Sequence, residues 1–308
     1  MREGSDYGSE NYKFFSKKLK KFLYVDRVAI DKKYRSIRKT KCNNRNCKCT
    51  RRNCEIVSSN SRHINSFNQA YFIGIGGIGM SALARYFLSK GWRVGGYDKT
   101  PSKLTETLEK EGAKVHFEDL GDGLPREFLS KGDTLVVYTP AIPKAMKELV
   151  FLQENDYSVF KRSEVLGMIT RDSQALCVAG THGKTTTSSL LAHILNESKL
   201  KCSAFLGGIS TNFNSNFIGS AESELTVIEA DEFDRSFLKL NPFASIVTTT
   251  DADHLDIYND DASFQQSFQD YANLIDANGY LIRQANVKLN HSNSISYGMN
   301  CKADYKGY

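Results

Sequence analysis

Residues 175–187 read Ala-Leu-Cys-Val-Ala-Gly-Thr-His-Gly-Lys-Thr-Thr-Thr. An apolar run, a glycine turn and the start of a helical pattern follow one another here, which is the order of a phosphate-binding loop. Backbone N–H groups of such a turn and the positive end of the helix dipole both point at a bound anion. The motif predicts that Lys184 reaches the β- and γ-phosphates and that Thr185 offers its hydroxyl to Mg²⁺, so we expect this chain to use ATP.

One position of this loop departs from the general Gly-x4-Gly-Lys-Ser/Thr pattern, because Val178 stands where the first glycine would be. We expect Gly180 to supply the tight turn instead. The predicted ATP-binding residues are Gly180, Thr181, His182, Gly183, Lys184, Thr185 and Thr186.

A second glycine-rich turn, Gly-Ile-Gly-Gly-Ile-Gly over residues 74–79, follows the apolar run 70–73 and opens a helical pattern. In that context the glycines indicate a bound diphosphate, because they let the backbone approach the phosphates closely. Asp98 ends the next predicted strand, Arg93–Tyr97, where an acid can meet a ribose hydroxyl. NAD is the usual ligand of such a turn. Another nucleotide diphosphate is the alternative, since the turn recognises the diphosphate and not the nicotinamide.

Carboxylates follow two predicted strands of the second half of the chain. The strand 225–230 delivers Glu229 beside the phosphate loop, where a magnesium ligand is expected. The strand 244–249 leads into Asp-Ala-Asp-His-Leu-Asp at residues 251–256, and His254 among these acids is a candidate for a second divalent ion. The predicted metal ligands are Thr185, Glu229 and His254, and the predicted catalytic residues are Lys184, Glu229 and His254.

The charge of the chain is unevenly distributed. Residues 1–66 carry 18 Lys and Arg against 6 Asp and Glu, which leaves residues 67–308 with a net charge of −6 within a total of +6. A basic arm can bind nucleic acid or anionic lipid, but a solvated, disordered leader is the commoner outcome, so a nucleic-acid partner is not expected. Cysteines in this leader leave a zinc site as an alternative, although their spacing lacks the usual gap between pairs: Cys42, Cys47, Cys49 and Cys54.

Neither a membrane-spanning apolar run nor a signal peptide is recognisable, so no membrane partner is expected and a cytoplasmic protein is predicted. Beyond the leader, strands and helices alternate in the manner of βαβ units. We predict an α/β protein with a Rossmann-like nucleotide-binding domain over residues 67–167 and a P-loop-type ATP-binding domain over residues 168–308. Both sheets should be mostly parallel, with helices on both faces. A connection is expected at Met168–Gln174, a helix at Ala262–Ala277, and only a weak strand in the polar sequence after residue 279.

Four ordered stretches carry a resemblance to a known family: Gly74–Ser81, Gly180–Thr187, Glu229–Asp234 and Asp253–Asp256. Together they resemble the Mur ligases of peptidoglycan synthesis, over about residues 68–308. The resemblance implies three domains, which bind the UDP of UDP-N-acetylmuramate, ATP with Mg²⁺, and the incoming amino acid. Within the family, the sequences of these stretches are most similar to those of the ligase that joins L-alanine to UDP-N-acetylmuramate through an acyl phosphate.

The family's functional residues can be carried over to the matching positions of this chain. On the UDP side the resemblance implies Gly74, Gly76, Gly77, Gly79, Met80, Ser81, Asp98, Thr139, Ala141 and Ile142. Near the muramate it implies Gly207, Gly208, Thr211 and Asn212. Lys184 and Thr185 would hold ATP and Mg²⁺, Glu229 would bind the first magnesium ion and His254 would serve the second. No protein nucleophile is required, because ATP activates the lactyl carboxylate.

Two departures from the family pattern bear on activity. Thr249 stands where the family has an asparagine, and the sequence stops before the family's adenine-contacting His-Asn-x-x-Asn stretch and its C-terminal, amino-acid-binding domain. We therefore expect the chain to correspond to the N-terminal and central portions of the enzyme and to turn over poorly by itself. Two alternatives stay open: a ligase that reattaches recycled tripeptide to UDP-muramate, and a nucleotide-binding module without catalysis.

Overall fold

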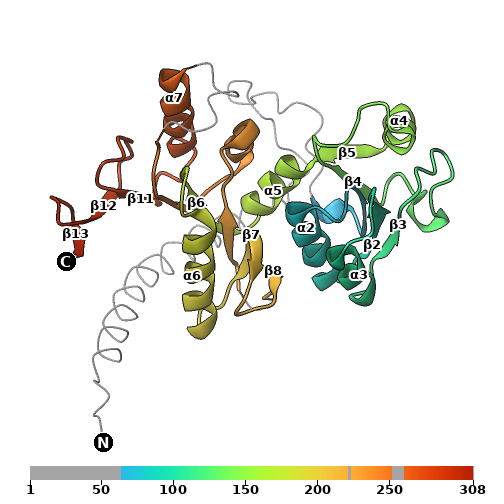
Figure 1. Ribbon diagram of the computed structural model, residues 1–308, viewed down its shortest axis with the longest axis horizontal. Helices are drawn as coiled ribbons and strands as arrows, with labels where there is room; N and C mark the ends of the chain where they lie inside the picture. The colour runs from blue at the N-terminus through green and yellow to red at the C-terminus, as the bar shows by residue number, and fades with distance from the viewer. Residues whose placement is uncertain (1–63, 221–222, 252–259, 308) are drawn as a thin grey trace, which may run out of the picture. The chain divides into compact units, whose positions relative to one another are not determined.

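The computed structural model describes residues 64–220, 223–251 and 260–307, which form two β-sheets in succession along the chain (Figure 1). The first sheet has the strand order β3-β2-β1-β4-β5, with all neighbouring strands parallel. Its strands are β1 (Gln69–Ile73), β2 (Arg93–Tyr97), β3 (Lys114–His116), β4 (Thr134–Tyr138) and β5 (Ser158–Lys161). The helices and 3-10 turns of this part of the chain are η1 (Ile64–Ser66), α2 (Ile78–Ser89), α3 (Lys103–Lys110), η2 (Arg126–Phe128), α4 (Lys147–Glu154) and α5 (Arg162–Arg171).

The second sheet has the order β13-β12-β11-β10-β6-β9-β7-β8, and only the β7–β8 pair is antiparallel. Its strands are β6 (Gln174–Ala179), β7 (Ser203–Ser210), β8 (Ser215–Ile218), β9 (Leu225–Glu229), β10 (Ala244–Val247), β11 (Tyr280–Gln284), β12 (Ser294–Met299) and β13 (Tyr305–Gly307). The helical elements are α6 (Lys184–Glu197), η3 (Phe233–Lys239) and α7 (Asp261–Ala272). Because β9 and β10 flank β6 in parallel, the carboxyl ends of these strands meet at one edge.

The alternating sides of β1 explain how the first sheet is covered on both faces. Ala70 and Phe72 join one buried cluster with residues of α2, whereas Tyr71 and Ile73 join another with residues of α4 and η2. All five residues of β1 are buried. A strand that is buried on both faces reads as a continuous apolar run. The α/β class with mostly parallel sheets, predicted from such runs, is confirmed.

The core of the second sheet is built from aromatic side chains that η3 and α7 place against β6. Phe237 of η3 stacks on Tyr271 of α7 with ring centroids 4.8 Å apart. Cys177 of β6 is buried in the same cluster, and burial raises the pKa of its thiol to about 12. The buried face of α7 thus contributes core residues to the second sheet.

Met168–Gln174, predicted to connect the two domains, begins inside α5, which continues to Arg171, and ends at Gln174, the first residue of β6. The helix forms because Val165 and Ile169 lie on one side of it and are buried in the core. The predicted boundary between residues 167 and 168 therefore falls inside a helix.

Two predictions of secondary structure are wrong at the C-terminal side. The helix expected to reach Ala277 ends at Ala272, and the amide of Asp276 instead donates to Pro242 O. The polar sequence after residue 284 forms β12 and β13, which pair in parallel with β11 and with each other. These strands are stabilised by backbone pairing to a neighbour, so their own apolar pattern is weak. Among the described residues, no helix has the length and hydropathy needed to cross a membrane.

Candidate active site

The phosphate loop lies between β6 and α6, at the centre of the carboxyl edge of the second sheet. Gly180 has φ +129°, and a Cβ there would collide with Thr248 Oγ1 and lie 2.9 Å from Thr249 N. Only glycine avoids both the strained backbone and the collision. The tight turn is thus made at Gly180, as the sequence predicts. His182, Gly183, Thr185 and Thr186 are exposed, so the loop faces solvent.

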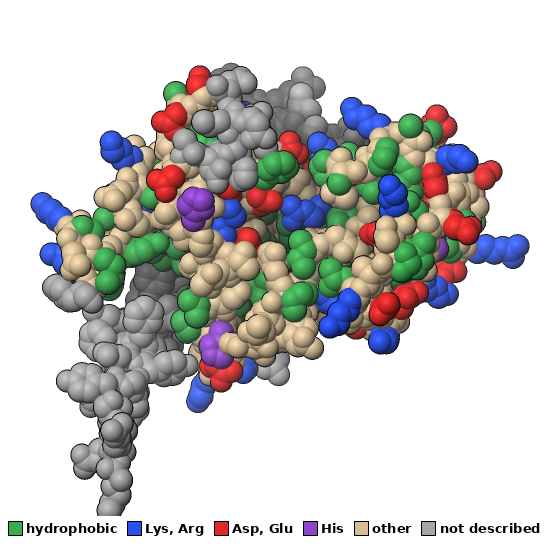
Figure 2. All heavy atoms as spheres, in the orientation of Figure 1, with side chains coloured by type: hydrophobic (Ala, Val, Ile, Leu, Met, Phe, Trp, Pro, Cys, Tyr) green, Lys and Arg blue, Asp and Glu red, His purple; other side chains and the backbone are tan. Residues whose placement is uncertain are grey.

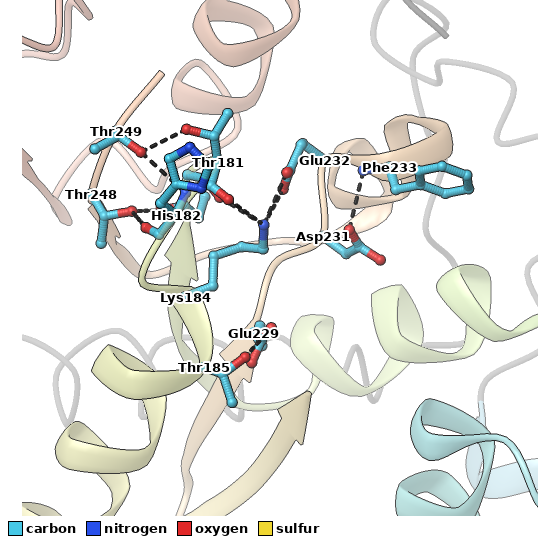
Figure 3. Close-up of polar contacts among 12 residues, drawn as sticks. Thr181, His182, Lys184, Thr185, Glu229, Asp231, Glu232, Phe233, Thr248 and Thr249 are labelled. Carbon is cyan, nitrogen blue, oxygen red and sulfur yellow. Dashed lines mark hydrogen bonds and ion pairs between the residues drawn. The ribbon is translucent and has the colours of Figure 1, made fainter. Parts of the chain in front are cut away.

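Two threonines at the end of β10 hold this loop in place (Figure 3). The backbone carbonyl of Thr249 accepts from Thr181 N at 3.1 Å, and its Oγ1 lies 2.6 Å from Thr181 Oγ1. The same Oγ1 accepts from His182 N at 3.1 Å, while Thr248 Oγ1 donates to His182 O at 2.5 Å. The departure noted at Thr249 therefore places a hydroxyl in the loop-anchoring position. Thr248 was not singled out from the sequence, which carries no local signal for it.

Lys184 begins α6 and turns its ammonium group back toward the loop. Its Nζ donates to Gly180 O at 2.8 Å and lies 2.9 Å from Glu232 Oε1 and 2.8 Å from Oε2 (Figure 3). The Glu232 side chain is only 1% exposed and that of Lys184 15%. Burial raises the pKa of Glu232, and the hydrogen bond with Lys184 opposes that rise. The ammonium thus lies within the loop, where a phosphate group could replace or join its present partners.

Glu229, at the end of β9, reaches the first turn of α6. Its Oε1 accepts from Thr185 Oγ1 at 2.9 Å, and its Oε2 accepts from Gly207 N at 3.0 Å. A hydroxyl and a carboxylate beside a phosphate loop form the hard oxygen donor set that Mg²⁺ requires. Within the described residues, no group of three or more His, Cys, Asp and Glu side chains is placed so that it could hold a metal ion by itself. Mg²⁺ does not need one, because waters and phosphates complete its shell.

His254 lies outside the described residues, so its predicted metal role stays a prediction. The residues predicted near the muramate divide into two pairs. Gly207 and Gly208 belong to β7 and lie beside Glu229 and Thr185: the Gly207 amide binds the Glu229 carboxylate, and a Cβ on Gly208 would lie 3.6 Å from Thr185 Cγ2. Thr211 and Asn212 lie on the exposed turn between β7 and β8.

The other glycine-rich turn joins β1 to α2 and is held by hydrogen bonds to the end of β2. Gly74 N donates to Tyr97 O at 2.8 Å, and Gly76 N donates to Asp98 Oδ2 at 2.7 Å. Asp98 therefore contacts the turn itself. A Cβ on Gly74 would lie 3.1 Å from Thr139 Cγ2 and 3.3 Å from Ile142 Cδ1. The structure thus gathers Asp98, Thr139 and Ile142 around the turn, and Ala141 is exposed nearby in sequence.

Met80 and Ser81 are placed differently from their neighbours, because their side chains are buried. Ser81 Oγ accepts from Asn216 Nδ2 at 2.9 Å, and the same amide donates to Ile78 O at 2.6 Å. Arg85 donates to the Asn216 carbonyl oxygen from the other side. Asn216 lies on β8, so this buried network joins the helix after the first glycine turn to the second sheet. Sequence reasoning missed Asn216, one of three asparagines within residues 212–216.

Comparison with known proteins assigns both sheets to one family. Residues 69–174 match the family described as Mur ligase family, catalytic domain, and residues 178–306 match the Mur ligase middle domain. Over 226 residues the chain is 54% identical to the UDP-N-acetylmuramate–L-alanine ligase of Phocaeicola vulgatus, covering 73% of this chain and 49% of the relative. It is 56% identical over 214 residues to the ligase of that name from Flavobacterium psychrophilum, covering 70% and 47%.

Solved structures share the fold. The UDP-N-acetylmuramate-alanine ligase of Thermotoga maritima superposes with a TM-score of 0.66 at 26% identity, over 77% of this chain and 54% of that one. The UDP-N-acetylmuramate:L-alanyl-gamma-D-glutamyl-meso-diaminopimelate ligase of Neisseria meningitides gives 0.67 at 24% identity, over 75% and 78%. The chain spans about half the length of the curated relatives it matches.

Proposed function

Because this chain belongs to the Mur ligase family, we propose that it provides the two nucleotide-binding parts of a ligase that joins L-alanine to UDP-N-acetylmuramate while ATP is converted to ADP and phosphate. The first part, residues 67–167, would bind the UDP of the sugar acid. The second, residues 168–308, would bind ATP and Mg²⁺. The names of the relatives support the choice of substrates, and the geometry of the phosphate loop supports the choice of cofactor.

The observation that carries the proposal is the arrangement of Lys184, Thr185 and Glu229 around one loop. Lys184 would neutralise the β- and γ-phosphates from within the loop, where its Nζ already lies 2.8 Å from Gly180 O. Thr185 and Glu229, joined by a 2.9 Å hydrogen bond, would hold Mg²⁺ between them. The ion would shield the anionic groups that must approach each other.

The proposed reaction has two steps that balance without a protein nucleophile. The lactyl carboxylate oxygen attacks the γ-phosphorus of ATP, and the bond from that phosphorus to the β,γ-bridging oxygen breaks. ADP departs, and the product is an acyl phosphate. The neutral amine of L-alanine then attacks the acyl carbon, inorganic phosphate leaves as the amide forms, and the nitrogen gives up one proton to solvent. A carboxylate is a poor electrophile, so ATP is needed to activate it in the first step. Preorganised positive charge from Lys184 and the loop amides would lower its barrier.

The first step can be tested with this chain. We expect hydroxylamine to trap a hydroxamate when the chain is mixed with Mg·ATP and UDP-N-acetylmuramate, and we expect Lys184→Met to abolish it. Phosphate release with L-alanine or with the tripeptide as acceptor then separates the two ligase activities. Absence of both nucleotide binding and hydroxamate formation in the unsubstituted chain would contradict the proposed function.

A further inference from the structure

Arg162 lies beside the first glycine turn, at a position that neither glycine motif accounts for. It is the first residue of α5 and follows β5, so it stands at the carboxyl edge of the first sheet. Ligands of open parallel sheets bind outside this edge. A Cβ on Gly79 would lie 2.8 Å from Arg162 Nη1 and 3.2 Å from its Cζ. The guanidinium group therefore lies directly against the end of the first glycine turn.

The helix that carries Arg162 is anchored on its far side. Asn241, which follows η3, donates from its Nδ2 to Gly167 O at 3.1 Å and from its backbone to Thr170 Oγ1 at 3.0 Å. These bonds hold the middle of α5 against the second part of the chain, while Arg162 at its start lies beside the first sheet. The arginine is thus presented from a packed element, which is what a precise binding contact requires.

The present partner of the guanidinium group is weak. Arg162 Nη2 lies 3.8 Å from Asp231 Oδ2, beyond hydrogen-bond distance, and the two side chains are 26% and 43% exposed. No other ion pair or hydrogen bond of this side chain is found within the described part of the chain. Arg162, Asp231 and Glu229 line one small cleft. Acidic and basic side chains lie next to each other near the middle of the view in Figure 2, over the region where Figure 1 draws α5.

We propose that Arg162 binds the diphosphate of the nucleotide sugar held by residues 74–79, exchanging its contact with Asp231 for the phosphate oxygens. This inference rests on the proposed function. A guanidinium group offers parallel N–H donors that match a phosphate in a bidentate manner, which a single carboxylate at 3.8 Å does not use. The diphosphate is favoured over the reacting carboxylate because the guanidinium lies against Gly79.

The released Asp231 would then stand next to Glu232, whose carboxylate pairs with Lys184 of the phosphate loop. Arg162 therefore connects the diphosphate site to the chain segment that carries the ATP-site acids. Asp231 has the opposite effect on the ligand, because its carboxylate competes with the diphosphate for the same cation and repels it. The two residues are thus expected to change affinity in opposite directions.

Isothermal titration calorimetry of the whole chain with UDP-N-acetylmuramate and, separately, with Mg·ATP tests the inference. Arg162→Gln should weaken UDP-N-acetylmuramate binding roughly ten- to a hundredfold, the effect of losing charge-assisted hydrogen bonds, and leave Mg·ATP binding unchanged. Arg162→Lys should weaken the binding of UDP-N-acetylmuramate less than Arg162→Gln does. Asp231→Asn should strengthen binding of the sugar nucleotide. Arg171→Gln, at the exposed other end of α5, is the matched control and should bind as the unsubstituted chain does.

Unchanged UDP-N-acetylmuramate affinity in Arg162→Gln overturns the inference. It is also overturned if Asp231→Asn weakens binding as much as Arg162→Gln does, because the ion pair would then serve only to hold the loop. Should Arg162→Gln fail to fold, the opposed shifts of Arg162→Lys and Asp231→Asn decide the question. Failure of the unsubstituted chain to bind UDP-N-acetylmuramate, with Mg·ATP bound normally, counts against the proposed function itself.

Discussion

Gly207→Ala tests the proposed magnesium ligand Glu229, because the substitution places a single methyl group against its carboxylate. The added Cβ would lie within 2.6 Å of Glu229 Cδ and Oε2, and closer still to Oε1. Ordinary contact begins at 3.4 Å, so the carboxylate must retreat by about 1 Å. That movement breaks its bonds to Thr185 Oγ1 and Gly207 N, now 2.9 and 3.0 Å long.

The cost should fall on ligand binding and not on folding. The Glu229 carboxylate is the flexible end of a half-buried side chain, so it can turn toward water. The free energy of unfolding should therefore fall by only about 1 kcal/mol. Mg²⁺ demands near-ideal octahedral geometry with oxygens at about 2.1 Å, so a displaced carboxylate no longer serves as a ligand. Loss of one charged ligand corresponds to roughly 1.5–3 kcal/mol, or about ten- to a hundredfold in affinity for Mg·ATP.

Calorimetric titration with ATP in MgCl₂ and in EDTA measures the effect. In EDTA, Gly207→Ala and the unsubstituted chain should bind ATP alike, and only the unsubstituted chain should gain affinity when Mg²⁺ is added. Gly208→Ala is the control, because its Cβ would lie at an ordinary 3.6 Å from Thr185 Cγ2. A full magnesium-dependent gain in Gly207→Ala, or an equal loss in Gly208→Ala, would refute the assignment of Glu229 to the metal.

Three further outcomes are expected. Lys184→Met should lower the free energy of unfolding by roughly 3 kcal/mol, because the buried Glu232 loses its ammonium group, and adding Glu232→Gln should restore stability in urea denaturation without restoring ATP binding. Asn216→Ala should cost about 2 kcal/mol in the same assay, because Ser81 and its helix lose buried hydrogen bonds, and an unchanged midpoint would rule out that contribution. Glu148 is a buried residue of α4 whose Oε2 accepts from Tyr71 OH at 2.8 Å. Burial raises the pKa of its carboxyl group, so the folded state holds the proton more tightly than the unfolded state. Stability should therefore fall as pH rises from the ordinary carboxyl range through the raised pKa, and Glu148→Gln should flatten that part of the curve.

The elements that were predicted well are those whose signal is local. The apolar runs of β1 and β6, each followed by a glycine turn and a helix, follow from periodicity and from the conformations that glycine permits. The turn at Gly180 was predicted for this reason, and its φ of +129° agrees. Helices and strands that depend on a neighbour were predicted poorly. β12 and β13 have a weak apolar pattern of their own and form by pairing with β11.

The residues of the candidate site can also be divided into those with a local sequence signal and those without one. Gly180, Lys184 and Thr185 are recognisable because the motif places them within a few residues of one another. The groups that position them come from distant parts of the chain: Thr248 bonds His182 from 66 residues away, and Asn216 bonds Ile78 from 138. No periodicity or spacing encodes such pairs. The first arises because the parallel strands β6 and β10 bring their carboxyl ends to one edge, and the second because α2 of the first part packs against β8 of the second sheet. The local sequence thus specifies which groups can bind phosphate, and chain topology decides which carboxylates, hydroxyls and amides surround them.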